Sequence, residues 1–143
     1  MTSKHFTAGK RSVFAAAALA FGLGAAPAFA DDNKLTGGEE VPPVQTAATG
    51  DNMLKVDADG MVTGKVTTKG LEGTMAHIHM GAKGSNGPVI VPLKKGAAAG
   101  EWVPNDGAKL TDEQMKAYKA GNLYANVHSE MHKGGEIRDQ IEP

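Results

Sequence analysis

The alternation of apolar and polar residues predicts short β-strands along most of the chain after residue 31. Side chains on successive strand residues point to opposite faces, so a half-buried strand alternates between the two kinds. Residues 74–80 and 123–128 show this alternation, and residues 88–93 are rich in β-branched side chains. Further strands are predicted at residues 53–56 and 61–67, joined as a hairpin, and at residues 136–141. Residues 35–50 are expected to form either an edge strand or an irregular strand, because they contain two adjacent prolines.

One segment has the signature of a helix, at residues 111–120. Thr111 is a suitable N-cap, and Asp112 and Glu113 follow in the first turn. Gly121 stands just past the end, where glycine commonly terminates a helix. Many short strands and one short helix favour an all-β fold, an antiparallel β-sandwich of the immunoglobulin-like kind. A parallel α/β sheet would need a helix between most strands.

The first 30 residues follow a different pattern. Their charged residues are all basic, and an apolar run covers residues 13–29. The run ends in Ala28-Phe29-Ala30, which is typical of a signal-peptide cleavage site. We therefore expect residues 1–30 to be a cleaved signal peptide, with export to the periplasm or medium and no membrane insertion afterwards. An uncleaved anchor is the alternative, but Pro27 and the small residues near the end suit cleavage better.

The composition of residues 31–143 limits the class of protein. This part of the chain has the length of a single domain. Its 12 Lys and Arg against 16 Asp and Glu leave no basic stripe, so nucleic acid is not an expected partner. The chain has no cysteine and therefore no disulfide. Trp102 is expected in the core, and the oligomeric state is left open.

The histidines of this part of the chain fall into two short clusters. His77 and His79 share one face of the strand at residues 74–80, opposite its apolar face. His128 lies on the polar face of its own strand, and His132 follows in the next loop. If the two strands are neighbours, three imidazoles converge. The alternative is a set of surface or pH-sensitive histidines without a metal.

Three imidazoles suit copper, zinc, nickel or iron. We expect copper, as Cu(I) or Cu(II), ahead of zinc, because copper binds more tightly at an equivalent site. His132 or Met131 is a candidate fourth ligand, and a thioether suits reduced copper. Met80 is ranked below Met131, because it belongs to the apolar face of its strand.

Three blocks of the chain carry a family resemblance. They are LTGGEEVPP at residues 35–43, HIH at 77–79 with NGPV at 86–89, and NLYANVH at 122–128 followed by GEIR at 135–138. In these blocks the chain resembles bacterial CHRD-domain proteins, a family named after chordin. The resemblance covers nearly all of residues 31–143 and implies one CHRD domain.

The resemblance also implies a sandwich similar to that of Cu,Zn superoxide dismutase, with His77, His79 and His128 as copper ligands. No counterpart of that enzyme's zinc loop or disulfide is present in this sequence. Asp139 departs from the family pattern, which has glycine there, and falls on the apolar face of its strand. Either a bend in the strand or a cationic partner is expected at Asp139.

These observations predict an exported copper-binding protein for copper storage, delivery or tolerance. Its expected partners are the metal ion and another periplasmic copper protein. One alternative is a copper-only enzyme similar to superoxide dismutase, in which Arg138 attracts the anion; otherwise Arg138 makes a surface ion pair. Binding is favoured over catalysis, because no second catalytic group is evident. The other alternative is an interaction module without metal. Glu39 and Glu40 are expected to keep a strand edge soluble.

Overall fold

The computed structural model describes residues 33–143. The expected signal peptide at residues 1–30 lies outside the described residues. Within the described part, no helix is long and apolar enough to cross a membrane.

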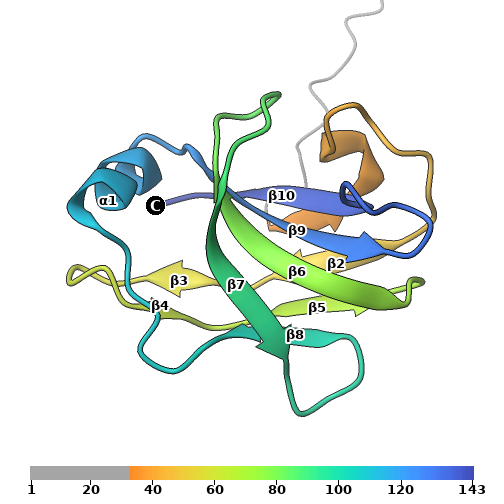
Figure 1. Ribbon diagram of the computed structural model, residues 1–143, viewed down its shortest axis with the longest axis horizontal. Coiled ribbons are helices and arrows are strands. Elements are labelled where there is room, and N and C mark those ends of the chain that lie inside the picture. Colours follow the sequence, from red (N-terminus) through yellow and green to blue (C-terminus); the bar gives the residue numbers. More distant parts are fainter. Residues whose placement is uncertain (1–32) are drawn as a thin grey trace, which may run out of the picture.

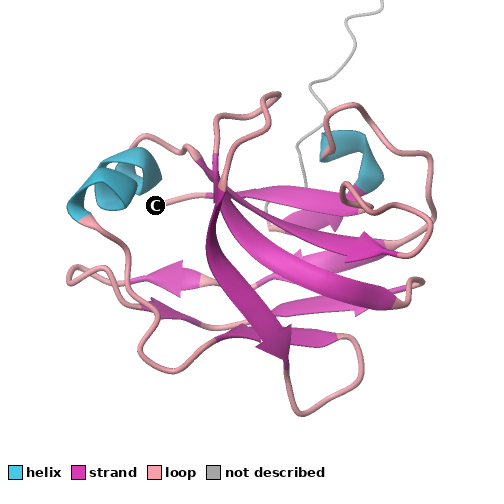
Figure 2. Ribbon diagram, viewed as in Figure 1, coloured by secondary structure: helices cyan, strands magenta, loops and turns pink. Residues whose placement is uncertain are grey.

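Eight antiparallel strands form a closed barrel (Figures 1 and 2). In order around the barrel they are β1 (Lys34–Thr36), β10 (Ile137–Ile141), β9 (Leu123–Ser129), β6 (Gly73–Met80), β7 (Val89–Lys95), β8 (Glu101–Pro104), β5 (Val66–Lys69) and β2 (Thr49–Asn52), which pairs with β1 again. The predicted all-β antiparallel class with one short helix is confirmed. The structure differs from the expected sandwich in that hydrogen bonds join all eight strands into one sheet. This closure pairs backbone groups that two open sheets would leave at their edges.

A two-stranded sheet stands beside the barrel and consists of β3 (Lys55–Val56) and β4 (Val62–Thr63). Its turn is closed by the Asp57 carboxylate, which accepts hydrogen bonds from the backbone N–H groups of Asp59 and Met61. The hairpin is therefore confirmed. The strand predicted at residues 61–67 is divided, because its first half pairs in this hairpin and its second half becomes β5 of the barrel.

The single α-helix within residues 33–143, α1 (Asp112–Lys119), follows β8 and precedes β9. Thr111 caps it as predicted: its side chain accepts from the Gln114 N–H, and the Gln114 side chain accepts from the Thr111 N–H. This reciprocal capping satisfies N–H groups that the first turn of a helix leaves unpaired. A short 3₁₀ helix, η1 (Gly37–Glu39), follows β1.

The core fills the barrel interior with aliphatic side chains. Ala76 and Ile78 of β6 are each 1% exposed, and Leu123, Ala125 and Val127 of β9 are fully buried. These are the apolar faces that the alternation predicts. Trp102 on β8 is 4% exposed, which confirms its place in the core. Because the apolar faces of β6 and β9 both point inward, their polar faces both point to the outside of the barrel.

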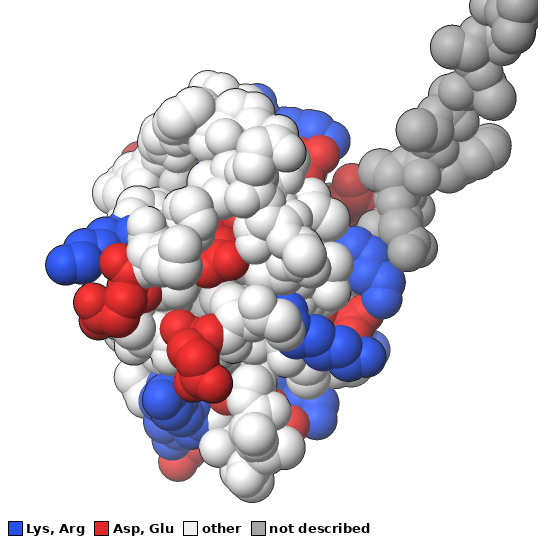
Figure 3. Space-filling view, turned by 90° about the vertical axis from the view of Figure 1, so that its right-hand side faces the viewer, with Lys and Arg blue, Asp and Glu red and all other residues white. Residues whose placement is uncertain are grey.

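Acidic and basic side chains are interspersed on the face of the molecule seen in Figure 3. Ion pairs link Lys65 with Glu101 at 2.7 Å and Lys83 with Glu39 at 3.2 Å. Partly exposed pairs of this kind contribute only up to about 1 kcal/mol each. The stability of the fold therefore rests mainly on the buried aliphatic core.

Asp139 differs from both expectations for its strand. The pairing of β10 with β9 continues regularly through Asp139, which lies opposite Ala125, so the strand does not bend there. Its partner is an amide rather than a cation, because the Asn52 side chain donates a 2.9 Å hydrogen bond to Asp139 Oδ2. Burial raises the pKa of Asp139 to about 6, against the hydrogen bond from Asn52, which lowers it.

We predict a pH-dependent stability from Asp139. Its folded-state pKa of about 6 lies above the ordinary value of 3.8, so the protonated form favours the fold. The stabilisation is complete below the ordinary value and is lost as pH rises through about 6. Asp139→Asn should remove a dependence of about 2 kcal/mol between about pH 4 and pH 7, measured by urea unfolding.

The exposed Asp106→Asn variant is the matched control, since it also removes one carboxylate. Stability profiles of wild type and Asp139→Asn that run parallel over this pH range would contradict the prediction.

Candidate metal centre

The two strands that carry histidine clusters are neighbours in the barrel, β6 beside β9 (Figure 1). In their register His77 lies opposite Asn126, His79 opposite Tyr124, and His128 opposite Met75. The condition for three converging imidazoles is therefore met. All three histidines lie on the outer face of the sheet, opposite the apolar core.

The three rings approach one another closely enough to share one ion. One nitrogen from each of His77, His79 and His128 can be chosen so that all lie within 4.8 Å of one another. Nδ1 of His77 lies 3.0 Å from Nε2 of His128. Two nitrogens bound to one ion at about 2.0–2.1 Å are separated by about 3 Å, so this pair already has the spacing of shared ligands.

Two backbone carbonyls hold two of these rings. Nδ1 of His79 lies 2.9 Å from the Gly87 oxygen, and Nδ1 of His128 lies 2.8 Å from the Lys133 oxygen. A carbonyl oxygen only accepts, so each Nδ1 carries the proton and each Nε2 keeps its lone pair. Nε2 of His79 is buried without a hydrogen-bond partner. A ring with one nitrogen donating to a carbonyl and the other free is the usual arrangement of a metal-binding histidine.

The surroundings of His77 and His79 favour the neutral form of these two rings. Burial lowers the pKa of His77, and the nearby rings of His128 and His79 lower it further. Burial also lowers the pKa of His79, which outweighs the hydrogen bond to Gly87 that raises it. Neutral imidazole is the form that binds a metal ion, so His77 and His79 are in the binding form near neutral pH.

Arg138 is 1% exposed, so the expectations that it attracts an anion or makes a surface ion pair are both wrong. Its guanidinium lies 3.5 Å from the ring centroid of Tyr124, and the same Tyr124 ring stacks on the His79 ring at a centroid distance of 4.7 Å. The guanidinium also donates to the Ala82 carbonyl at 3.0 Å and to Gln140 at 3.1 Å. Arg138 is thus neither a surface ion pair nor open to an incoming anion. It holds the loop at residues 81–88, which supplies the Gly87 carbonyl to His79.

Gly87 itself has a steric reason to be glycine. A Cβ at this position would overlap the carbonyl oxygen of Met80, across the base of the loop. The absence of a side chain lets the loop fold back on the end of β6. That approach places the Gly87 oxygen beside His79.

Glu40 is a buried part of the same region that sequence reasoning missed. It is 5% exposed, so the expectation that it serves a soluble strand edge is wrong. Burial raises the pKa of Glu40 to about 7, although Arg138 and the Asn126 side chain lower it. No hydrogen bond of ordinary geometry reaches Glu40 Oε1. The sequence gives no signal for this burial, because a loop that is distant in the chain provides it.

That loop is the segment between β9 and β10. Gly135, at φ 125°, packs so closely on Glu40 and Asn126 that a Cβ would overlap both side chains. The same loop supplies the Lys133 carbonyl that holds His128. Glu40 therefore lies beneath the segment that orients one of the three rings.

The structure gives different information on the two candidate fourth ligands, His132 and Met131. His132 lies in the loop after β9, where its N–H donates to the Ser129 hydroxyl. Among the described His, Asp and Glu residues, the convergent group consists of His77, His79 and His128 and does not include His132. Met131 is 87% exposed, and its part in binding stays a prediction.

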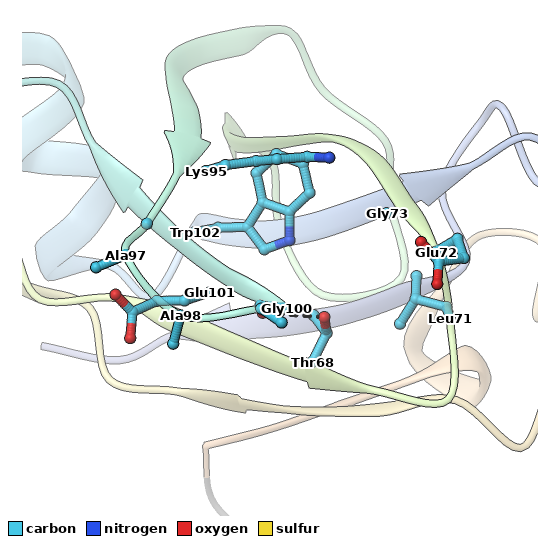
Figure 4. A pocket seen from close by; sticks show the side chains of 12 residues that line it. Thr68, Leu71, Glu72, Gly73, Lys95, Ala97, Ala98, Gly100, Glu101 and Trp102 are labelled. Carbon is cyan, nitrogen blue, oxygen red and sulfur yellow. Dashed lines mark hydrogen bonds between the residues drawn. The ribbon is translucent and has the colours of Figure 1, made fainter.

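A separate hollow of about 490 Å³ lies beside Trp102, and no histidine lines it (Figure 4). The Lys95 side chain extends along the indole, with its ammonium 5.9 Å from the ring centroid. A loop of small residues, 96–100, forms one side. The hollow is thus distinct from the histidine cluster.

The fold and the cluster define a small all-β protein with a candidate three-histidine metal site on its outer face. The family model for the CHRD domain matches residues 32–141, and the chain belongs to this family. No curated protein and no solved structure gives a match.

We predict the tautomers of the metal-free histidines. His79 and His128 should both be protonated at Nδ1, because each Nδ1 faces a carbonyl oxygen. Long-range ¹H–¹⁵N NMR spectra of the metal-free protein at slightly alkaline pH distinguish the two nitrogens. His132 serves as the internal comparison. Observation of Nε2-protonated rings at His79 and His128 would overturn this reading of the site.

Proposed function

We propose that this CHRD protein is exported and binds one copper ion through His77, His79 and His128, for copper storage, delivery or tolerance. The observation that carries the proposal is the convergence of three ring nitrogens, two of them on rings held through Nδ1 by backbone carbonyls. Copper is favoured over zinc by the affinity order at nitrogen sites. Three donors without a fixed fourth also suit copper better than a closed structural zinc site.

Metal binding requires one proton to move. In the metal-free site His77 Nδ1 donates to His128 Nε2, because the Nε2 atom of His128 carries a lone pair. Both atoms can bind the same ion once the His77 proton has moved to its own Nε2. This change of tautomer leaves the ring neutral, so the net charge of the three rings is unchanged.

The unequal burial of the three rings supports delivery as well as storage. His79 is 9% exposed and His128 is 6% exposed, whereas His77 is more accessible. His77 therefore offers the side from which an ion could enter or pass to another periplasmic copper protein.

A copper-only enzyme similar to superoxide dismutase is the second candidate. The pairing of an H-x-H strand with a third histidine on the adjacent strand favours it, and redox catalysis would need an open coordination position at the metal. This candidate function includes the proposal that the barrel is similar to the β-sandwich of superoxide dismutase. The burial of Arg138 counts against it, because within residues 33–143 no guanidinium is left open to guide an anion. Dismutation by the copper-loaded protein no faster than by free copper would eliminate it.

We predict that the purified protein retains about one copper per chain after reconstitution and desalting. A His77→Ala/His79→Ala double variant should lose the copper, because two of the three donors are removed. Metal content is measured by mass spectrometry, with zinc loaded in parallel.

His132→Ala is the matched control, since it removes a histidine outside the cluster and should keep the copper. Circular dichroism checks that each variant is folded. Equal copper content in the double variant and the wild type would refute the proposed site. Absence of copper from the wild type would leave an interaction module as the alternative.

A further inference from the structure

Met75 stands beside the three histidines on the outer face of the sheet. It precedes His77 by two residues on β6, so the two side chains share a face. In the pairing with β9 it lies directly opposite His128. Residues directly opposite in an antiparallel pair have Cβ atoms about 4.5–5.5 Å apart. Met75 is therefore an immediate neighbour of two of the three candidate ligands.

The Met75 side chain is apolar, yet it is not packed in the hydrophobic core. It is 49% exposed, whereas Ala76 next to it on the inward face is 1% exposed. A register irregularity between Gly73 and Met75 precedes it in the β6–β9 ladder. Such irregularities re-aim side chains and are common beside functional sites. A large apolar side chain thus stands at the surface, directed to the side of the sheet where the histidines lie.

We propose that the Met75 thioether is a fourth ligand for Cu(I) in this site, an inference that rests on the proposed copper function. Thioether sulfur is soft and binds Cu(I), whereas nitrogen donors suffice for Cu(II). The Met side chain has three rotatable bonds, and its exposure leaves it free to turn toward the ion. The consequence is a site that holds reduced copper more tightly than three histidines alone would hold it.

The other two methionines near the clusters are less suitable. Met80 has the opposite orientation on β6 from His77 and His79 and packs against the hydrophobic core. Met131 is 87% exposed in the loop after β9, where it has no partner strand to fix its distance from the rings. Met75 is placed by the strand pairing itself.

The test compares Met75→Leu with Met131→Leu and Met53→Leu. Leucine keeps the approximate volume and removes only the sulfur, and Met53 is a similarly exposed methionine at 43%. Cu(I) affinity is measured anaerobically against a chromophoric Cu(I) chelator, and Cu(II) affinity is measured separately. Met75→Leu should weaken Cu(I) binding by at least about tenfold and leave Cu(II) binding unchanged, while both controls match the wild type.

X-ray absorption of the Cu(I)-loaded protein gives an independent readout. The wild type should show a sulfur neighbour of copper, and Met75→Leu should show only nitrogen or oxygen neighbours. A wild type that binds Cu(I) with no sulfur neighbour, or an affinity loss in Met131→Leu instead, overturns the role of Met75 while the three-histidine site stands. A wild type that retains no copper overturns both the inference and the proposed function.

Discussion

The pairing of β6 with β9 is the interaction on which the histidine cluster depends. Each strand has one apolar face, and burial of both faces in the same core fixes the orientation of the opposite faces. A slip of one residue in either strand would turn its histidines into the barrel and expose its aliphatic side chains. The free energy of burying the core therefore also specifies where His77, His79 and His128 lie.

The strand pairing brings the rings together, but loops decide how each ring is turned. Backbone carbonyls from the loop after β6 and the loop after β9 fix the protonated nitrogen of His79 and His128. Arg138 holds the first loop, and Glu40 lies under the second. Burying a charged group is expensive unless it is paired, and the buried guanidinium of Arg138 is paired with the Ala82 carbonyl and the Gln140 side chain. On the outer face of the barrel, Arg138 and Glu40 thus contact the two loops that orient His79 and His128.

Sequence reasoning identified the residues whose role follows from alternation. His77, His79 and His128 were assigned to outward faces because their neighbours in the chain are aliphatic, and the helix cap at Thr111 follows from local chemistry. It misjudged Arg138 and Glu40, whose burial comes from segments far away in the chain. It also passed over Met75, although the same two-residue period that groups His77 with His79 includes it. The two-residue period of a strand therefore already places Met75 on the face that carries His77 and His79.

The strand character of most segments, the helix that begins after Thr111, and the apolar faces of β6 and β9 follow from the local sequence. These are local properties, set by the period of apolar residues and by capping groups. Three other features depend on tertiary contacts: the closure of the sheet into a barrel, the pairing of β6 with β9, and the hydrogen bond between Asp139 and the Asn52 amide. These are contacts between residues distant in the chain, and the pattern of a single strand carries no information about which other strand will be its neighbour.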